Sequence, residues 1–485
     1  MRLRTTRLAL STVAALAVSH PALAQTTPTS TKQYDDGGLY EGSFKDGLQH
    51  GTGTYRLPNG YEYSGEWVNG EIKGRGVARF PDGSVYEGEF EKGKPQGVGR
   101  IIFADGGSYE GGWSDGKIAG QGVAQYANGL RYEGAFLNAQ HHGKGLLTAP
   151  NGYIYDGTWV GGLKEGSAHI TYPDGAIYIG DVAAGARQGQ GRLTMPDGLI
   201  YEGTWSAGQI GGTGKLTQAN GDVFEGSLVQ GRREGEGRVI YANGDVYEGQ
   251  FAGDKRHGQG RFTGADGYVY TGAWMDGRIE GQGSVTYPDG AVYTGLFRAD
   301  QPDGQGKITY ADGATYEGSW TGGVIEGTGT ATYANGVVYE GSFKSAKNHG
   351  FGIMTYADGY RYEGNWSEGR REGQGKASYP DGTVYEGNFL AGQRHGTGKI
   401  TMADGFIYEG DWEQGEISGQ GRATYANGDV YEGGFRRGKR QGLGTITYAS
   451  GGSETGEWTN GVLANTASPA SAAPEPQVPA QTADQ

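Results

Sequence analysis

The chain has 485 residues, of which 98 are glycine and none is cysteine, and its formal net charge is -14. The absence of cysteine excludes disulfides, thiol catalysis and cysteine-ligated metals, and the negative charge argues against nucleic acid as a partner. Abundant glycine without a three-residue period is typical of disorder, but an aromatic content of 12% indicates an ordered structure.

Residues 1–24 have the pattern of a secretory signal peptide. Three arginines among the first seven residues precede the apolar segment 8–18, and Ala-Leu-Ala at 22–24 forms a cleavage motif. We therefore expect an exported protein, periplasmic or extracellular. Residues 25–39 are expected to form a linker and the N-terminal edge of the folded region.

From residue 40 to residue 461 the sequence repeats every 23 residues, without insertion or deletion. Counting Tyr-Glu-Gly as the start of a unit gives nineteen units, and the third position is glycine in all of them, from Gly42 to Gly456. The last unit, which begins at Glu454, is degraded. Such self-similarity at a fixed period is the signature of a repeat architecture.

Within a unit the side chains alternate with period two, which predicts strands. In the unit that begins at Tyr86, positions 1, 3 and 5 (aromatic, glycine, aromatic) share one face, and residues 97–103 form a second strand. An Asp-Gly or Asn-Gly pair near the end of most units predicts a tight hairpin turn there. The connection through residues 93–97 is expected to be longer.

This arrangement predicts a register for the hairpin. Phe90 is expected to lie over Gly99, and Tyr86 is expected to pair with Phe103. Aromatic rings that cover glycine stabilise strands that are otherwise weak. The prediction explains why position 14 is glycine in every complete unit except one, which has Ala168.

The hairpins predict an all-β fold, an elongated, twisted, single-layer antiparallel ribbon of about nineteen tandem 23-residue β-hairpin repeats. The motif Tyr-Glu-Gly-x-[Phe/Trp]-x-x-Gly-x-x-x-Gly-x-Gly resembles the MORN repeat (membrane occupation and recognition nexus) over residues 40–461. The resemblance implies a hairpin ribbon, often dimeric, used for scaffolding or membrane-proximal attachment. Nothing in the chain resembles the lipid-kinase or methyltransferase domains that accompany some such arrays, so the resemblance implies no enzymatic role.

The aromatic residue at position 5 alternates between Phe and Trp, so the true period is 46 residues. The alternation breaks at Val182 and Leu228, where smaller side chains predict a bend near residues 178–246. Neutral drift in one duplicated copy is the alternative. The tryptophans assigned to the aromatic face are Trp67, Trp113, Trp159, Trp274, Trp320, Trp366 and Trp412.

Units with Phe at position 5 often carry basic residues and histidine in the following segment, whereas Trp units often carry Ile at position 10. The basic residues predict an edge that binds anionic lipid headgroups or acidic polysaccharide. A solvated edge whose lysines prevent edge-on aggregation is the alternative. The candidate residues are Lys255, Arg256, His257, Arg394, His395, Arg436, Arg437, Lys439 and Arg440.

Repeated histidines and glutamates raise the possibility of metal binding or catalysis. Histidines at position 11 lie at least two units apart, which is roughly 19 Å at the usual strand spacing, whereas zinc needs ligands about 2 Å away. Glutamates at position 2 form a regular ladder on the non-aromatic face, where basic residues at position 15, such as Arg238, Lys307 and Lys376, can pair diagonally with them. We therefore predict no catalytic residue, no metal site and no cofactor.

Residues 462–485 are rich in Ala, Pro and Gln and predict a disordered tail. Together these observations predict a non-catalytic scaffold or adaptor of the cell envelope. It would bind a protein partner, or a second copy in a homodimer, through its repeated surface. Direct binding of anionic lipid by the basic edge, or of polysaccharide on exposed aromatics, is the alternative.

Overall fold

The computed structural model describes residues 29–464. Within this range there are 39 strands and no helix. The described residues therefore contain no helix that is long and apolar enough to cross a membrane. The chain divides into two compact units after Pro196. This division lies within residues 178–246, the segment in which the sequence predicts a bend. The bend itself stays a prediction.

The first unit contains β1 (Ser30–Gln33), β2 (Leu39–Lys45), β3 (Leu48–Arg56), β4 (Glu62–Val68), β5 (Glu71–Arg79), β6 (Val85–Glu91), β7 (Lys94–Ile102), β8 (Ser108–Ser114), β9 (Lys117–Gln125), β10 (Arg131–Leu137), β11 (Gln140–Thr148), β12 (Ile154–Val160), β13 (Leu163–Thr171), β14 (Ile177–Ala183) and β15 (Ala186–Thr194). The second unit contains β16 (Ile200–Ser206), β17 (Gln209–Thr217), β18 (Val223–Val229), β19 (Arg232–Ile240), β20 (Val246–Ala252), β21 (Lys255–Thr263), β22 (Val269–Met275), β23 (Arg278–Thr286), β24 (Val292–Arg298), β25 (Gln301–Thr309), β26 (Thr315–Thr321), β27 (Val324–Thr332), β28 (Val338–Lys344), β29 (Lys347–Thr355), β30 (Arg361–Ser367), β31 (Arg370–Ser378), β32 (Val384–Leu390), β33 (Gln393–Thr401), β34 (Ile407–Glu413), β35 (Glu416–Thr424), β36 (Val430–Arg436), β37 (Lys439–Thr447), β38 (Ser453–Thr459) and β39 (Val462–Leu463).

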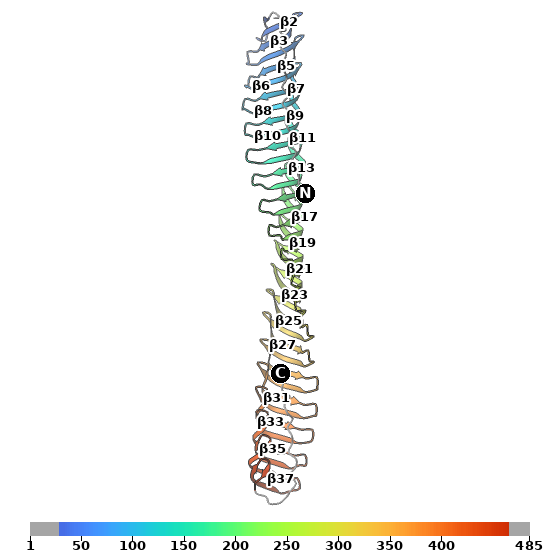
Figure 1. Ribbon diagram of the computed structural model, residues 1–485, viewed down its shortest axis with the longest axis vertical. Helices are drawn as coiled ribbons and strands as arrows, with labels where there is room; N and C mark the ends of the chain where they lie inside the picture. Colours follow the sequence, from blue (N-terminus) through green and yellow to red (C-terminus); the bar gives the residue numbers. More distant parts are fainter. Residues whose placement is uncertain (1–28, 465–485) are drawn as a thin grey trace, which may run out of the picture. The chain divides into compact units, whose positions relative to one another are not determined.

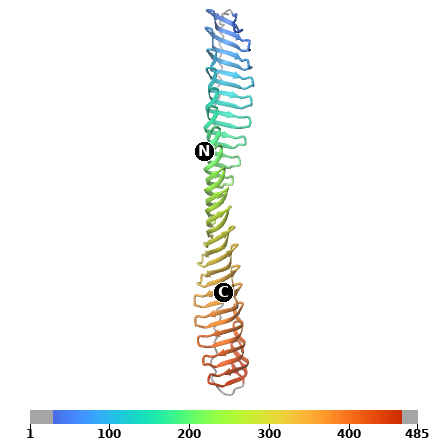
Figure 2. The same cartoon turned by 180° about the vertical axis from the view of Figure 1, so that it is seen from behind.

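Each unit is an open antiparallel sheet in which the strands lie side by side in chain order (Figures 1 and 2). In the first unit β6 pairs with both β5 and β7, and β7 then pairs with β8. In the second unit β32 lies between β31 and β33 in the same way. The predicted all-β fold of tandem antiparallel hairpins is confirmed.

The tight turn of each hairpin lies at positions 7 and 8 of the repeat. Between β6 and β7 these residues are Lys92 and Gly93, with φ of 50° and 76°, as a two-residue type I′ turn requires. The Asp-Gly segment instead lies in a five-residue loop, 103–107, closed by a hydrogen bond from the Phe103 amide to the Gly107 carbonyl at 2.8 Å. The prediction was therefore wrong about both connections: the one at Lys92 and Gly93 is the tight turn, and the one that contains Asp-Gly is the longer loop. Asp105 accepts a hydrogen bond from the Gly107 amide instead of entering the left-handed region.

The position of the tight turn sets the register, which also differs from the prediction. Glu91 pairs with Lys94 across the turn, and a β-bulge between Gly88 and Glu89 then places Gly88 opposite Gly99 and Tyr86 opposite Ile101. Phe90 therefore does not lie over Gly99. Tyr86 covers Gly99 instead and leaves no room there for a Cβ atom, which is why position 14 is glycine.

The core of each unit lies on the aromatic face. The aromatic residue at position 1 is at most 2% exposed in every complete repeat. Tyr86 makes edge-to-face contacts with Phe90 at 5.0 Å and with Trp113 of the next repeat at 4.9 Å. Trp113 also donates a hydrogen bond from Nε1 to the Gly99 carbonyl at 3.2 Å. The rings bury one another along the sheet, so this face is filled without a second layer.

Each end of the described region is a short edge strand. Residues 30–33, within the segment expected to form a linker and the N-terminal edge, form β1, which pairs with β2. The free edge of β2 offers backbone groups to any extended segment, and β1 occupies that edge. Val462 and Leu463, expected to begin the tail, pair with β38 as β39. The predicted signal peptide and residues 465–485 lie outside the described residues.

Candidate functional site

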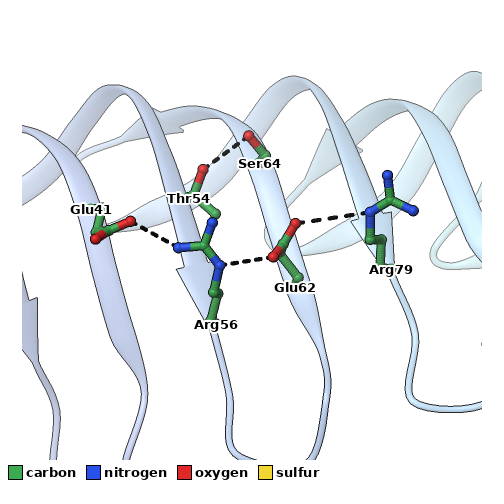
Figure 3. Close-up of polar contacts among 6 residues, drawn as sticks. All are labelled: Glu41, Thr54, Arg56, Glu62, Ser64 and Arg79. Carbon is green, nitrogen blue, oxygen red and sulfur yellow. Dashed lines mark hydrogen bonds and ion pairs between the residues drawn. The ribbon is translucent and has the colours of Figure 1, made fainter.

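The non-aromatic face carries rows of alternating charge. Figure 3 shows one such row, in which Arg56 contacts Glu41 and Glu62, each at 2.8 Å, and Arg79 lies 3.9 Å from the other oxygen of Glu62. Beside this row, Thr54 donates a hydrogen bond to Ser64 at 3.0 Å. These side chains are partly exposed, so each ion pair contributes less than about 1 kcal/mol.

The basic residues at position 15 pair with the position-2 glutamates of the following repeat. Lys307 lies 3.2 Å from Glu317, and Lys376 lies 2.6 Å from Glu386. Arg238 contacts Glu248 at 2.8 Å in the same way. The partners are directly opposite one another across two strands, not diagonal as predicted. The regular glutamate ladder is thus largely a ladder of neutralised pairs.

The predicted tryptophan face is present, but its side chains are buried. Trp113 and Trp320 are 8% and 7% exposed, and the other five tryptophans assigned to this face are less exposed still. Their flat faces meet neighbouring rings and position-10 side chains. The proposed binding of polysaccharide required exposed aromatic rings, and these tryptophans do not provide them.

The nine residues of the predicted basic edge occupy different environments. Lys255, His257, Arg436, Arg437 and Lys439 are exposed at the edge formed by the tight turns and the strand ends beside them. Arg256 and His395 are half-buried there, whereas Arg394 and Arg440 are buried. The prediction of an exposed edge is thus wrong for Arg394 and Arg440.

Position 10 lies on the aromatic face because it is opposite position 5 across the tight turn. The guanidinium carbon of Arg256 lies 4.2 Å from the ring centroid of Trp274 in the next repeat, and that of Arg440 lies 4.1 Å from the ring centroid of Trp458. Cation–π contact of this kind stabilises a partly desolvated guanidinium. The same position carries further cations that the sequence analysis missed, namely Lys164, Arg187, Arg233 and Arg371. The isoleucines at position 10 were the signal that this position faces the core.

Histidines do not gather into a metal site. Within residues 29–464 no group of three or more His, Asp or Glu side chains is placed to hold a metal ion. His141 stacks on Tyr132 with ring centroids 3.7 Å apart and shares a hydrogen bond with the Tyr126 hydroxyl at 2.8 Å. Burial lowers the pKa of His141, so it is a neutral part of the aromatic packing at pH 7.

The tight-turn edge of the first unit includes an uncharged stretch that the sequence analysis also missed. Three consecutive turns and the residues beside them, 137–140, 160–163 and 183–186, contain no Asp, Glu, Lys or Arg. Leu137, Val160 and Leu163 are 50%, 52% and 55% exposed. The turns adjoin one another, because the Gly162 amide donates to the His141 carbonyl at 3.0 Å. We call these three segments the apolar turns.

Comparison with known proteins gives one family match. The family model described as MORN repeat matches eighteen segments between residues 40 and 453, each 21 to 23 residues long: 40–60, 63–85, 86–108, 109–131, 132–152, 155–177, 178–200, 201–223, 224–246, 247–267, 270–292, 293–315, 316–338, 339–359, 362–384, 385–406, 408–430 and 431–453. The degraded unit that begins at Glu454 is not matched. No curated protein matches the chain significantly.

The similar solved structures are distant. The TCP10 domain of Danio rerio CPAP, in complex with a peptide of Danio rerio STIL, is 15% identical, with 53% of this chain and 93% of that chain covered and a TM-score of 0.16. The TCP10c domain of Drosophila melanogaster Sas-4 is 14% identical, with coverages of 41% and 97% and a TM-score of 0.19. Virginiamycin B lyase from Staphylococcus aureus is 12% identical, with coverages of 61% and 97% and a TM-score of 0.11. TM-scores this low do not show a shared fold.

Proposed function

The chain belongs to the MORN repeat family, and on that premise we propose that it is a non-catalytic scaffold of the cell envelope that binds a protein partner through the apolar turns. The observation that carries this proposal is the exposure of Leu137, Val160 and Leu163 on three adjoining turns without charge. The rest of the described surface includes a face of largely neutralised ion pairs and a face closed by its own rings, and its other exposed apolar residues, such as Val98, Phe351 and Leu443, do not lie on adjoining uncharged turns. Contiguous exposed apolar groups mark sites of protein association.

A non-catalytic role is supported by the repetition itself. An active site requires one unique constellation of groups with distinct roles. Here the buried tyrosines, glycines and paired glutamates recur in unit after unit with the same contacts. A repeated surface of this kind suits a scaffold, in which neighbouring repeats share the binding of one extended partner.

Charge substitution at one apolar turn tests the partner site. Val160→Glu is expected to reduce cross-linking of the mature protein to its partner in intact cells at least tenfold, because a carboxylate must be desolvated at the contact. Val229→Glu is the matched control, since Val229 occupies the same repeat position at 55% exposure and pairs with Arg232. Equal cross-linking of the two variants, measured by mass spectrometry of the products, would remove the apolar turns as the site.

The cell-envelope location is tested separately. We expect the protein purified from its own cells to begin at Gln25 and to fractionate with the periplasm or medium, because residues 1–24 have the signal-peptide pattern. N-terminal sequencing checks this. An N-terminus at Met1 in the cytosolic fraction would overturn export and leave the partner site untouched.

Anionic lipid is the second candidate ligand, because one tight turn carries a cluster of exposed basic residues. Arg436, Arg437 and Lys439 surround the turn between β36 and β37, are exposed, and form no ion pair among the described residues. Juxtaposed cations of this kind attract an anionic membrane surface, with about 1 kcal/mol for each charge. The same turn edge in β28 and β29 is neutralised in part, because Lys347 contacts Glu368 at 2.7 Å.

Flotation with liposomes tests this candidate. The mature protein is expected to float with anionic and not with neutral vesicles, and to be released at high salt. Charge reversal of Arg436 and Lys439 should abolish flotation, whereas reversal of Lys344 and Lys347, at the same repeat positions, should reduce it less. Failure to float with anionic vesicles at low salt would exclude lipid as a direct ligand.

A further inference from the structure

A row of tyrosines follows the loop edge of the second unit. Tyr287, Tyr310 and Tyr333 occupy position 18 in three consecutive repeats, and each is the first residue of a five-residue loop. Tyr310 and Tyr333 are each 39% exposed, and Tyr287 is half-buried. We call these three residues the tyrosine row. They offer the exposed aromatic rings that the buried tryptophans do not.

The loops that carry the tyrosine row are closed and regular. The Tyr310 amide donates to the Ala314 carbonyl at 2.8 Å, and the Gly313 amide donates to the Tyr310 carbonyl at 3.0 Å. The loops at Tyr287 and Tyr333 are closed by the same two bonds. Each repeat adds two strands about 4.8 Å apart, so successive tyrosines are spaced by about 10 Å. The row is therefore a preformed series of rings at a fixed interval.

Within these three loops the tyrosines form a single line of rings. The residue that ends each loop is small: Ala291 and Val337 are 3% and 7% exposed, and Ala314 is the equivalent residue between them. A proline-rich peptide docks in a groove lined by aromatic rings, and these loops provide no second line of rings to form one. A single line of exposed rings favours a ligand that is flat.

A polar side chain accompanies each ring of the tyrosine row. Asp289, Asp312 and Asn335 are exposed, and Oδ1 of each accepts a hydrogen bond from the backbone amide two residues later, at 2.9, 2.9 and 3.1 Å. The second oxygen of each carboxylate is not used in this bond and can accept a hydrogen bond from a ligand hydroxyl. The three loops contain no Lys or Arg. They therefore favour an uncharged ligand that is rich in hydroxyl groups.

The spacing of the row matches a polysaccharide with β-1,4 linkages. In such a chain each sugar ring is turned over relative to the previous one, so only every second ring presents the same face in the same direction. Two sugar residues of the extended chain are nearly as long as one repeat, which is about 10 Å. The C–H groups on one face of a β-linked sugar ring pack on the electronegative face of an aromatic ring.

We propose that the tyrosine row binds an uncharged β-1,4-linked polysaccharide, with one tyrosine against every second sugar ring and the loop side chains Asp289, Asp312 and Asn335 on its hydroxyl groups. The row lies in the second unit, whereas the apolar turns lie in the first. This site therefore goes beyond the partner contact proposed at the apolar turns, and neither depends on the other.

Titration of the protein with cellohexaose and chitohexaose tests the row, because six sugar residues extend over three repeats. Each hexasaccharide is expected to bind at least about tenfold more tightly than its disaccharide, since three rings then act on one ligand. Maltohexaose has α-1,4 linkages that coil the chain, so it should not bind. Added salt should leave the affinities unchanged, because the ligand carries no charge. Isothermal titration calorimetry measures all of these affinities.

Substitutions in the row separate the ring from the rest of the loop. Tyr310→Ala removes the middle ring and should weaken the binding of cellohexaose at least about fivefold. Tyr310→Phe keeps the ring and should bind as the wild type does. Tyr241→Ala is the matched control, because Tyr241 occupies the same repeat position with Gln218 and Gly264 in place of aromatic neighbours. This control should also bind as the wild type does.

The hexasaccharides also distinguish the sources of the ligand. Binding of chitohexaose alone would identify an N-acetylated glycan, binding of cellohexaose alone would identify a glucan, and binding of both would identify the ring face that they share. Each of these outcomes supports the site when Tyr310→Ala weakens the binding. If Tyr310→Ala does not fold, the comparison with maltohexaose in the wild type decides.

Three results would overturn the proposal. The first is the absence of binding by both β-1,4-linked hexasaccharides, and binding of decaproline in their place would assign the row to a peptide. The second is equal binding of maltohexaose and cellohexaose. The third is equal weakening by Tyr310→Ala and Tyr241→Ala, which would show that the row is not the site.

Discussion

Tyr86 lies over Gly99 and donates its hydroxyl hydrogen to the carbonyl of Glu89 at 3.0 Å. The same arrangement recurs at Tyr293, whose hydroxyl donates to the Leu296 carbonyl at 2.9 Å. One side chain thus fills the space above two facing glycines and satisfies a backbone carbonyl. The repeated glycines are therefore a steric requirement of the tyrosine.

Adding a side chain at Gly99, beneath the Tyr86 ring, tests whether the tyrosine requires glycine there. Gly99→Val is expected to destabilise the hairpin by about 1–3 kcal/mol, because overpacking displaces Tyr86 and breaks its hydrogen bond. Amide exchange in β6 and β7 should accelerate accordingly. Ala168 already occupies this position beneath Tyr155, so Ala168→Gly is the control and should change exchange in β12 and β13 by far less. Unchanged exchange in Gly99→Val would show that the tyrosine does not require glycine.

The hairpin is set by its two-residue turn. Positions 7 and 8 both adopt positive φ, as in Asn69 and Gly70 at 47° and 89°, and this geometry matches the twist of the flanking strands. Ala139 departs from the usual glycine at position 8, with φ of 63° after Asn138 at 50°. An alanine held in the left-handed region costs about 1 kcal/mol.

Restoring glycine at this turn should stabilise the hairpin. Ala139→Gly creates Asn-Gly, the favoured type I′ pair, and is expected to slow exchange in β10 and β11 by an amount equivalent to about 1 kcal/mol. Gly162→Ala is the opposite control. Gly162 has φ of 84° with open space around it. The alanine at this position would therefore destabilise the turn through backbone strain alone, without a steric clash. Faster exchange in Ala139→Gly would contradict the type I′ assignment.

At the scale of the whole molecule, stability is a sum over similar neighbouring contacts, so a property shared by most repeats has a large combined effect. Burial raises the pKa of Tyr86, Tyr109 and Tyr132 to about 12, and Tyr247 and Tyr293 behave alike. The unfolded chain titrates its tyrosines near pH 10. Because the folded pKa is the higher one, the tyrosines favour the folded state below about pH 10, and this contribution is lost as pH rises towards 12.

The protein is therefore expected to unfold in alkali. Circular dichroism of the protein should show loss of β-structure between about pH 10 and 12. Replacing Tyr86, Tyr109 and Tyr132 with Phe should raise the pH at which β6 to β11 begin to exchange rapidly, since Phe carries no ionisable group and already occupies this position as Phe224. A transition unaffected by these substitutions would assign alkaline unfolding to other groups.

The local spacing of residues was sufficient to predict the repeat, the two strands of each unit and the all-β class, because the 23-residue period and the two-residue alternation are local properties of the chain. It was not sufficient to predict which connection is tight. Asp-Gly and Lys-Gly both favour turns, and the choice between them depends on the pairing of whole strands. The error at Lys92 and Gly93 then carried over to the partners of Phe90 and Tyr86.

The sequence by itself determined that the chain is a tandem array with an aromatic face and a charged face. Only the tertiary structure decided what each face leaves available. The tryptophans are buried because each ring packs against the next repeat, and Arg394 is buried because position 10 turns onto that same face. Val160 and Leu163 are exposed because the turns lie beyond the rings. Exposure depends on contacts between repeats, which the sequence of a single repeat does not contain.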